Sequence, residues 1–310
     1  MDGISLKQLR YAEALAAHGH FGRAATACAI SQPALSTQIK ALEEAMGALL
    51  FERAARTVRP TRIGQDFIAR TREILRAVDD LKDLTRISAQ GLSGRLRVGL
   101  IPTLAPYLLP AFIRELAESH PAIEPHVREA TTPRLVEELL DGRLDVALVA
   151  LPIDEPALSE RPLFTEGLAL VRHASQADAP LPERDRLAEE KLLLLEEGHC
   201  FRDQALAFCS PAARPRGQLD ASSLSTLVEM VGAGLGVTLI PEMAVAAEGR
   251  RASVCIRPLD DPKLARTIGL LWRRSSPLAD PFAEIAQAAV RAGARVGAHP
   301  VSPEAFGQKG

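Results

Sequence analysis

Residues 21–64 read FGRAATACAISQPALSTQIKALEEAMGALLFERAARTVRPTRIG. The small residues from Gly22 to Cys28 predict a short helix that can pack tightly against its neighbours. Ser31 can cap the helix that follows, and Pro33 suits the first turn of that helix. Two short helices joined by a tight turn predict a helix-turn-helix.

The second of these helices is amphipathic. Its apolar residues recur at helical spacing and form one stripe: Leu35, Ile39, Leu42 and Met46. The opposite face carries short polar and basic side chains: Gln32, Ser36, Thr37 and Lys40. Such groups can hydrogen-bond to base edges or phosphates in a DNA major groove, which predicts a recognition helix. Taken alone, the pattern also fits an ordinary amphipathic surface helix.

A basic run follows directly in residues 51–62, FERAARTVRPTR. Its arginines lie three residues apart beside the single acidic residue Glu52: Arg53, Arg56, Arg59 and Arg62. The net charge of −2 gives no overall sign of a nucleic-acid partner, so affinity for DNA must come from a local patch. Next to a recognition helix, the run predicts a two-stranded wing that lies along the DNA backbone and reaches a minor groove. A solvated basic loop is the alternative.

A proline-free segment from Ile63 to about Ser88 predicts one helix of about seven turns. Its apolar residues form a narrow seam: Ile63, Phe67, Ile74, Val78 and Leu81, with Leu84 or Ile87. A long helix with one such seam needs a partner helix, so we expect a dimerisation linker. Two DNA-reading domains side by side suit a two-fold DNA site.

The residues after Gly91–Gly94 change to short β-branched and leucine-rich runs that alternate with helical patterns. The predicted strands are 95–100, 123–129, 144–151, 168–172, 192–195, 236–240 and 267–272, and the predicted helices are 104–119, 133–141, 200–209, 222–234 and 279–293. This rhythm predicts a mostly parallel sheet covered by helices on both faces. Two α/β lobes with a cleft between them fit the length better than one sheet.

The predicted architecture is therefore multidomain, an all-α winged helix-turn-helix with a long linker helix, followed by a two-lobed α/β domain. The boundaries are 1–62 for the winged helix-turn-helix, 63–90 for the linker and 91–294 for the α/β domain. Within the latter, one lobe takes residues 91–163 and 268–294, and the other takes 164–267. Residues 295–310, rich in Gly, Pro and polar groups, predict a disordered tail.

Composition restricts the class of protein. A chain of 310 residues is long enough for two or more cores, and 47% hydrophobic with 25% charged residues is typical of soluble globular proteins. The start, Met1–Lys7, lacks the pattern of a signal peptide, and no apolar run is long enough to span a membrane. Four cysteines without a CxxC pair argue against a disulfide framework and a zinc site. We expect a cytoplasmic protein with no metal, no cofactor and no membrane partner.

The run of residues 21–64 resembles the DNA-binding segment of LysR-type transcriptional regulators along its whole length. The α/β region follows the order of their effector domains, so the resemblance covers about residues 5–294. Four stretches resemble the peroxide sensors of the OxyR group in that family: LIPTLAPYLLP (100–110), EATTPRL (129–135), LLEEGHCFRDQALAFC (194–209) and RTIGLLW (266–272). The stretch around Cys200 is the most specific of the four.

This resemblance implies a transcription regulator, not an enzyme, that binds promoter DNA, forms a homotetramer, contacts RNA polymerase and activates antioxidant genes in response to hydrogen peroxide. It also implies an effector domain of two α/β lobes like those of periplasmic binding proteins, between which the chain crosses twice. The residues it directs toward DNA are Ser31, Gln32, Pro33, Ser36 and Lys40, with Arg53 and Arg56 in or beside the wing. The residues it implies for binding and polarising peroxide are Thr103, Thr132, His199, Asp203 and Arg266.

Cys200 stands at the predicted start of a helix, after Gly198 and His199 and before Arg202 and Asp203. A helix N-terminus and a nearby cation both stabilise a thiolate. The thiolate is the form that attacks the O–O bond of a peroxide. We therefore expect Cys200 to be the reactive cysteine, with Arg202 among the groups that stabilise it.

Cys209 comes nine residues later, which on a continuous helix means ~13.5 Å of rise and a turn of about 900°. A disulfide needs Cα atoms within about 7 Å, so a Cys200–Cys209 disulfide requires the helix to unwind. Oxidation of Cys200 to a sulfenic acid, followed by this reversible disulfide, would then act as a switch. By spacing alone, the alternative is two inert buried cysteines. Cys28 and Cys255 are expected to be core thiols.

Three other functions compete with the peroxide sensor. A LysR-type regulator can instead bind a small organic metabolite reversibly in the cleft between the lobes. A thiol peroxidase would also use a reactive and a resolving cysteine, but it leaves the DNA-binding third of the chain unexplained. A solute-binding protein is disfavoured because the signal peptide is missing.

Overall fold

The computed structural model describes residues 3–53, 57–83, 87–88, 91–182, 191–208, 220–250, 253–259 and 264–301. Arg56, Leu84 and Cys209 lie outside these ranges, as does the side chain of Arg53. The chain divides into two compact units, Met1–Thr85 and Arg86–Gly310.

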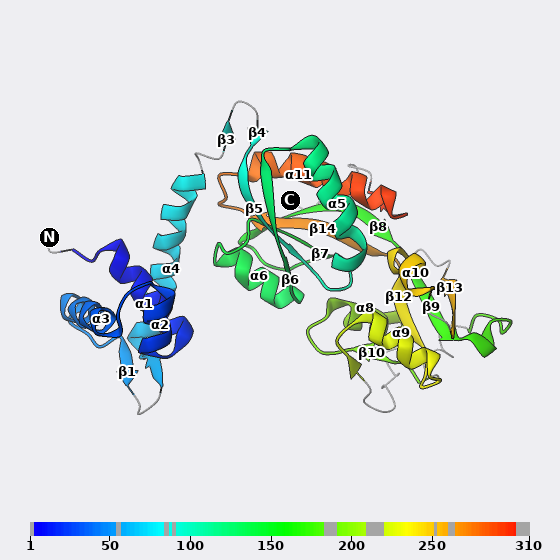
Figure 1. Ribbon diagram of the computed structural model, residues 1–310, viewed down its shortest axis with the longest axis horizontal. Helices are drawn as coiled ribbons and strands as arrows, with labels where there is room; N and C mark the ends of the chain where they lie inside the picture. Colours follow the sequence, from blue (N-terminus) through cyan, green and yellow to red (C-terminus); the bar gives the residue numbers. More distant parts are fainter. Residues whose placement is uncertain are drawn as a thin grey trace. The chain divides into compact units, whose positions relative to one another are not determined.

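The first unit is a three-helix domain with a two-stranded wing and a long helix (Figure 1). Its elements are α1 (Leu6–His18), α2 (Phe21–Ala27), α3 (Gln32–Met46), β1 (Phe51–Arg53), β2 (Val58–Pro60) and α4 (Arg62–Asp83). Ser31 caps α3 as predicted, because its hydroxyl oxygen accepts a hydrogen bond from the backbone N–H of Ala34 at 3.3 Å. Leu35, Ile39 and Leu42 are fully buried, but Met46 at the end of the predicted stripe is exposed.

Helix α4 is shorter than predicted. It ends at Asp83, and β3 (Ile87–Ser88) pairs antiparallel with β4 (Gly91–Leu92) where the sequence predicted helix as far as Ser88. Leu92 is buried in the core of the second unit, and its cross-strand partner is Ile87. A β-branched residue paired with a buried one favours a strand over the helical period, which explains the error.

The two sides of α4 differ in exposure. Ile68 is buried in the core that α4 shares with the other helices of the first unit, and Thr71 is also buried. On the predicted seam, by contrast, Ile63 is 58% exposed and Leu81 is 65% exposed. Ile74 is also exposed, whereas Phe67 and Val78 are half-buried. An apolar stripe on α4 is therefore left exposed by the described residues of the first unit.

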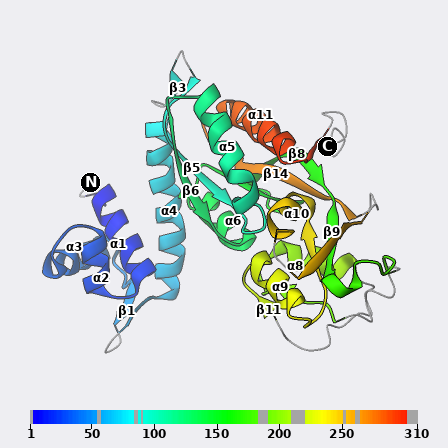
Figure 2. The ribbon, with the colours of Figure 1, turned by 45° about the vertical axis from the view of Figure 1, so that its right-hand side comes forward.

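The second unit contains two lobes, of which the first is built on a six-stranded sheet of order β15-β8-β14-β7-β5-β6. Its elements are β5 (Gly94–Leu100), α5 (Ala105–Ser119), β6 (Ile123–Glu129), α6 (Thr132–Leu140), β7 (Val146–Leu151), β8 (Leu158–Glu166), β14 (Arg266–Arg273), α11 (Ala279–Arg295) and β15 (His299–Pro300). Helices α5 and α11 pack side by side, and α6 packs against β7 and β14 (Figure 1 and Figure 2).

The sheet is mixed, so the prediction of a mostly parallel sheet is wrong for this lobe. Strand β5 runs parallel to β6 and β7, whereas β14 runs antiparallel to both β7 and β8. The sequence analysis missed β8 because its residues, LSERPLFTE, neither alternate strictly nor form one apolar run.

The second lobe has a three-stranded antiparallel sheet, order β12-β9-β13, and a separate parallel pair, β10 with β11. Its elements are β9 (Leu168–His173), the 3-10 helix η2 (Ala174–Gln176), β10 (Leu194–Leu195), α8 (Cys200–Phe208), β11 (Asp220–Ala221), α9 (Leu224–Gly232), β12 (Thr238–Pro241), α10 (Glu242–Glu248) and β13 (Val254–Pro258). The predicted helix over 200–209 is confirmed as far as Phe208. Helix α10 and strand β13 were missed.

The chain passes between the lobes at Gly167 and again just before Arg266. A Cβ atom on Gly167 would lie 2.8 Å from the Glu242 carboxylate, so a larger residue at this crossing would require the Glu242 side chain to move. The first lobe thus keeps residues through 166 and resumes at 266, a few residues from the predicted boundaries. The predicted disordered tail began too early, because α11 reaches Arg295 and β15 pairs with β8. Among the described helices, none has both the length and the apolar character to cross a membrane.

Candidate functional site

The predicted recognition helix presents its polar face to solvent. Gln32, Thr37 and Lys40 are exposed, and Ser36 is half-buried. The Thr37 hydroxyl donates to the Pro33 carbonyl at 3.0 Å, and Lys40 Nζ lies 3.6 Å from Glu44 Oε1. An exposed i,i+4 ion pair is weak, so Lys40 can readily exchange Glu44 for a phosphate. Ser31 and Pro33 are also exposed, at the start of the same helix.

The predicted wing is an antiparallel pair in which Arg53 faces Val58 and Glu52 faces Arg59. Arg59 is exposed. A buried carboxylate that the sequence analysis did not single out joins the wing to α3: Glu43 Oε1 accepts from the backbone N–H groups of Leu50 at 2.8 Å and Phe51 at 3.1 Å. These bonds fix where the first wing strand begins relative to the recognition helix.

In the second unit, three distant segments surround a small hollow that contains Cys200. Thr103 follows the carboxyl end of β5, Thr132 follows the carboxyl end of the neighbouring parallel strand β6, and Cys200 is the first residue of α8. The lining residues are Ile101, Pro102, Thr103, Thr131, Thr132, His199, Cys200 and Phe201. Cys200 is a free, half-buried thiol. Four predicted residues, Thr103, Thr132, His199 and Cys200, therefore meet at one place.

The two threonines differ in their hydrogen bonds. The Thr103 hydroxyl oxygen accepts from Arg266 Nη1 at 2.8 Å. The Thr132 hydroxyl is buried, with the residue 8% exposed, and has no hydrogen-bond partner among the described residues. An unpaired buried hydroxyl is costly, and this one belongs to a residue that lines the hollow beside Cys200.

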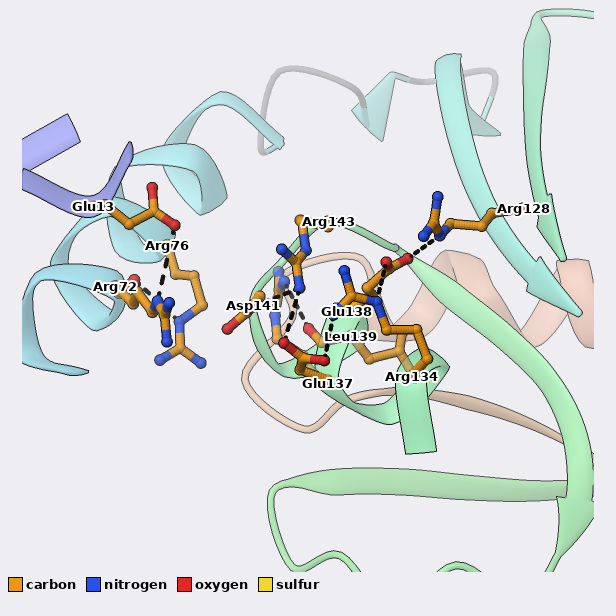
Figure 3. A network of polar contacts seen from close by, with 11 residues as sticks. Glu13, Arg72, Arg76, Arg128, Arg134, Glu137, Glu138, Leu139, Asp141 and Arg143 are labelled. Atoms are coloured by element: carbon orange, nitrogen blue, oxygen red, sulfur yellow. Dashed lines mark hydrogen bonds and ion pairs between the residues drawn. The ribbon is translucent and has the colours of Figure 1, made fainter. Parts of the chain in front are cut away.

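Helix α6, which begins at Thr132, is held by a cluster of ion pairs on its following turns (Figure 3). The nearly buried Glu138 carboxylate forms an ion pair with Arg134, in which Nε lies 3.0 Å from Oε1. The same carboxylate also pairs with Arg128 of β6. Glu137 pairs with Arg134 at 2.6 Å, and this bond lowers the pKa of the Glu137 carboxyl group. These contacts link α6 to the strand before it and so fix the position of Thr132.

Arg266 does not line the hollow but reaches it through Thr103. The residue is 3% exposed, and its guanidinium group forms an ion pair with the buried Glu166, with Nη2 at 2.7 Å from Oε1. Glu166 was missed by the sequence analysis because β8, on which it lies, was missed. The two residues face each other across the β8–β14 register.

His199 is almost completely buried beside Cys200. Burial lowers the pKa of its imidazole, an effect that the Glu196 and Glu129 carboxylates partly oppose. The ring is therefore held in its neutral form, in which one nitrogen donates and the other accepts a hydrogen bond. Gly198, at a φ of 91°, turns the chain into this residue and the start of α8.

Arg202, predicted to stabilise the thiolate, and Asp203, predicted to bind and polarise peroxide, are not among the residues that line the hollow. Arg202 Nη1 donates to the Leu195 carbonyl at 2.6 Å and pairs with Asp220 at 3.0 Å. Two residues along a helix turn the side chain by about 200°, which directs Arg202 away from Cys200 toward β10 and β11. Asp203 is exposed.

The other described cysteines are half-buried. Burial raises the pKa of the Cys28 thiol, with a smaller contribution from Glu13, and Cys255 Sγ lies 3.7 Å from the His173 carbonyl oxygen. Within the described ranges, no three His, Cys, Asp or Glu side chains are placed to hold a metal ion.

Comparison with known proteins places both units in one family. The model for bacterial regulatory helix-turn-helix proteins of the lysR family matches residues 6–65, and the LysR substrate binding domain matches residues 89–293. The DNA-binding transcriptional dual regulator OxyR of Escherichia coli K12 is 42% identical over 291 residues, covering 92% of this chain and 94% of that protein.

Two solved structures are similar over nearly the whole chain. Full-length OxyR from Pseudomonas aeruginosa, a cysteine-to-aspartate variant, is 34% identical with a TM-score of 0.73, covering 93% of this chain and 98% of that one. A cysteine-to-serine mutant of OxyR from Corynebacterium glutamicum with H2O2 bound is 36% identical with a TM-score of 0.65, covering 94% of this chain and 93% of that one.

Proposed function

Because the chain belongs to the LysR family of bacterial regulatory helix-turn-helix proteins, with OxyR regulators among its relatives, we propose that it is a DNA-binding transcription regulator that senses hydrogen peroxide through Cys200. The observation that carries the proposal is the buried, unpaired Thr132 hydroxyl in the hollow that also contains the free Cys200 thiol. A small polar molecule with donor and acceptor oxygens would satisfy that hydroxyl beside the sulfur.

In the proposed reaction the Cys200 thiolate attacks one oxygen of hydrogen peroxide. An S–O bond forms, the O–O bond breaks, and the second oxygen leaves as hydroxide, which solvent protonates to water. The sulfur is oxidised by two electrons to the sulfenic acid, and Cys209 then condenses with it to release a second water and form a disulfide. Neutral His199, Thr103 and Thr132 bind the peroxide, and Arg266 acts through Thr103.

The disulfide would change the affinity for DNA through the assembly of subunits. We propose a cytoplasmic homotetramer of two-lobed, periplasmic-binding-protein-like effector domains, joined through the apolar stripe of α4, that contacts RNA polymerase and activates antioxidant genes. DNA contacts come from Ser31, Gln32, Pro33, Ser36, Thr37 and Lys40, and from Arg53 and Arg56 in or beside the wing. Arg202 holds the start of α8 through the Leu195 carbonyl and Asp220, and the exposed Asp203 lies in the first turn of that helix, where a negative charge is favoured.

The test combines mass spectrometry of the peroxide-treated protein with DNA footprinting, in which the protein is bound to the region upstream of its own gene. One equivalent of peroxide should give a Cys200–Cys209 peptide and a changed footprint. Cys200→Ser should abolish both changes, and Cys28→Ser and Cys255→Ser should respond normally. A footprint that shifts with peroxide while both thiols stay free would refute the disulfide. A footprint that responds only to an organic metabolite would favour the reversible-ligand regulator.

A further inference from the structure

A buried carboxylate, Glu166, lies at the point where the chain leaves the first lobe. It is the last residue of β8 and is 1% exposed. Its Oε1 accepts from Arg266 Nε at 2.8 Å and from Nη2 at 2.7 Å, and its Oε2 accepts from the backbone N–H of Met243 at 3.2 Å. Both carboxylate oxygens are therefore occupied, one by the first residue of β14 and the other by α10 of the second lobe.

The remaining donors of Arg266 are directed to a single residue. Nη1 donates to the Thr103 hydroxyl at 2.8 Å, and Nη2 donates to the Thr103 carbonyl at 3.1 Å. The guanidinium carbon also lies 5.4 Å from the ring centre of Phe201, the residue after Cys200. In the described part of the chain, no hydrogen bond connects Arg266 to the Cys200 sulfur.

These bonds determine what the Thr103 hydroxyl can do. Because its oxygen accepts from a cation, its own hydrogen is left to donate, and no described group receives that hydrogen. A hydroxyl that accepts a charge-assisted hydrogen bond is a stronger donor, since successive hydrogen bonds polarise one another. Thr103 lines the hollow with Cys200, so this donor is available to a molecule bound there.

We propose that Glu166 is a positioning residue for peroxide reduction, which holds Arg266 so that the Thr103 hydroxyl donates to the departing oxygen. The inference rests on the proposed function and assigns Arg266 a role through Thr103 rather than through the sulfur. As the S–O bond forms and the O–O bond breaks, negative charge gathers on the leaving oxygen. A fixed donor at that oxygen stabilises the transition state more than the bound peroxide. Thr103 gives a hydrogen bond and keeps its proton, and solvent protonates the hydroxide.

The main test removes both charges at once. Loss of Glu166 alone leaves a buried cation without its partner, whereas replacing both members of a buried pair is usually tolerated. The Glu166→Gln/Arg266→Met variant of the full-length chain should fold and bind DNA when reduced. The rate of its oxidation by hydrogen peroxide can be measured as the loss of free thiol in a stopped-flow instrument. This rate should be between about 10-fold and 100-fold lower than that of wild type, since one preorganised donor is worth up to about 10²–10³ in rate.

The control uses another ion pair of the same lobe, in which the carboxylate is buried and the arginine side chain is 29% exposed. Arg97 of β5 and Asp145 pair at 2.5 Å, with the Asp145 side chain 2% exposed, and neither residue lines the hollow. Arg97→Met/Asp145→Asn should alter stability but leave the oxidation rate within about twofold. Glu166→Asp keeps the charge and shortens the side chain, so it should slow oxidation severalfold even if the double variant does not fold.

Combining substitutions at Thr103 with those at Glu166 and Arg266 distinguishes a positioning role from a general structural role. Thr103→Ser keeps the hydroxyl and should oxidise at near the wild-type rate, whereas Thr103→Val should be slow. Adding Glu166→Gln/Arg266→Met to Thr103→Val should cause no further loss, because the donor is already gone. The inference would be overturned if the rate losses of the combined variants multiplied. It would also be overturned if the Glu166→Gln/Arg266→Met variant or the Glu166→Asp variant oxidised as fast as wild type. Either result would leave the proposed function intact. A wild-type protein whose Cys200 peroxide does not oxidise would overturn the proposed function as well.

Discussion

Replacing Thr132 with Val should make the protein more stable and its thiol less reactive. The two side chains have nearly the same shape, so the substitution removes a hydroxyl and creates little cavity. The Thr132 hydroxyl is buried and has no hydrogen-bond partner among the described residues, and the residue is 8% exposed. Folding therefore desolvates this hydroxyl without compensation, at a cost of about 1–3 kcal/mol.

The expected gain is about 1 kcal/mol, the lower end of that range. In a domain of this size, such a gain raises Tm by about 2–4 °C, which calorimetry resolves. Oxidation of Cys200 by peroxide should slow by at least about tenfold, since one donor to the substrate is lost. A Thr132→Val variant that is less stable than wild type, or that oxidises at the wild-type rate, would refute the reasoning.

Two other threonines serve as controls. The Thr71 hydroxyl on α4 is also buried without a described partner, so Thr71→Val should raise stability by a similar amount and leave the oxidation rate unchanged. The Thr238 hydroxyl is buried but donates to the Leu193 carbonyl at 2.8 Å, so Thr238→Val should lower stability by about 1–3 kcal/mol. Agreement of all three variants would assign the Thr132 effect to a ligand site.

Three further predictions follow from α8, α4 and His199. Phe208 ends α8 about 12 Å along the axis from Cys200, and one Cα–Cα step of about 3.8 Å cannot bring the next residue within the roughly 7 Å of a disulfide. Oxidation should therefore raise hydrogen exchange in α8, and Cys209→Ser should prevent the rise; unchanged exchange in a disulfide-bonded sample would contradict this. Leu81→Glu should weaken self-association and DNA binding together in sedimentation and binding assays, because Leu81 is exposed on the apolar stripe of α4, and a fully associated variant would show that the stripe is not the interface. Because burial lowers the pKa of His199 in the folded state, the unfolded chain binds its proton at higher pH, so stability should be complete above about pH 6.5 and fall as the pH drops below it. His199→Gln should reduce that slope in denaturation measurements, and an unchanged slope would assign it to other groups.

Local patterns in the sequence were sufficient to place α3 and the start of α8. Ser31 and Pro33 predicted where α3 begins, and the spacing of Leu35, Ile39 and Leu42 predicted which face it buries; the structure confirms both. Caps and amphipathic periods depend on residues within a few positions of one another, so they can be read without the fold. The position of Cys200 at the start of α8 was predicted in the same way and is confirmed.

The tertiary structure alone decided the relations between distant segments. Helix α4 ends early because Leu92 is buried in the second unit and Ile87 pairs with it. Strand β8 has no regular apolar period, yet it carries Glu166, whose partner is 100 residues away. Arg202 is close to Cys200 in sequence but pairs with Asp220, because helical rotation directs it to another strand. A buried charge is stabilised by whatever group the fold brings within a few ångströms of it, and sequence spacing contains no record of that distance.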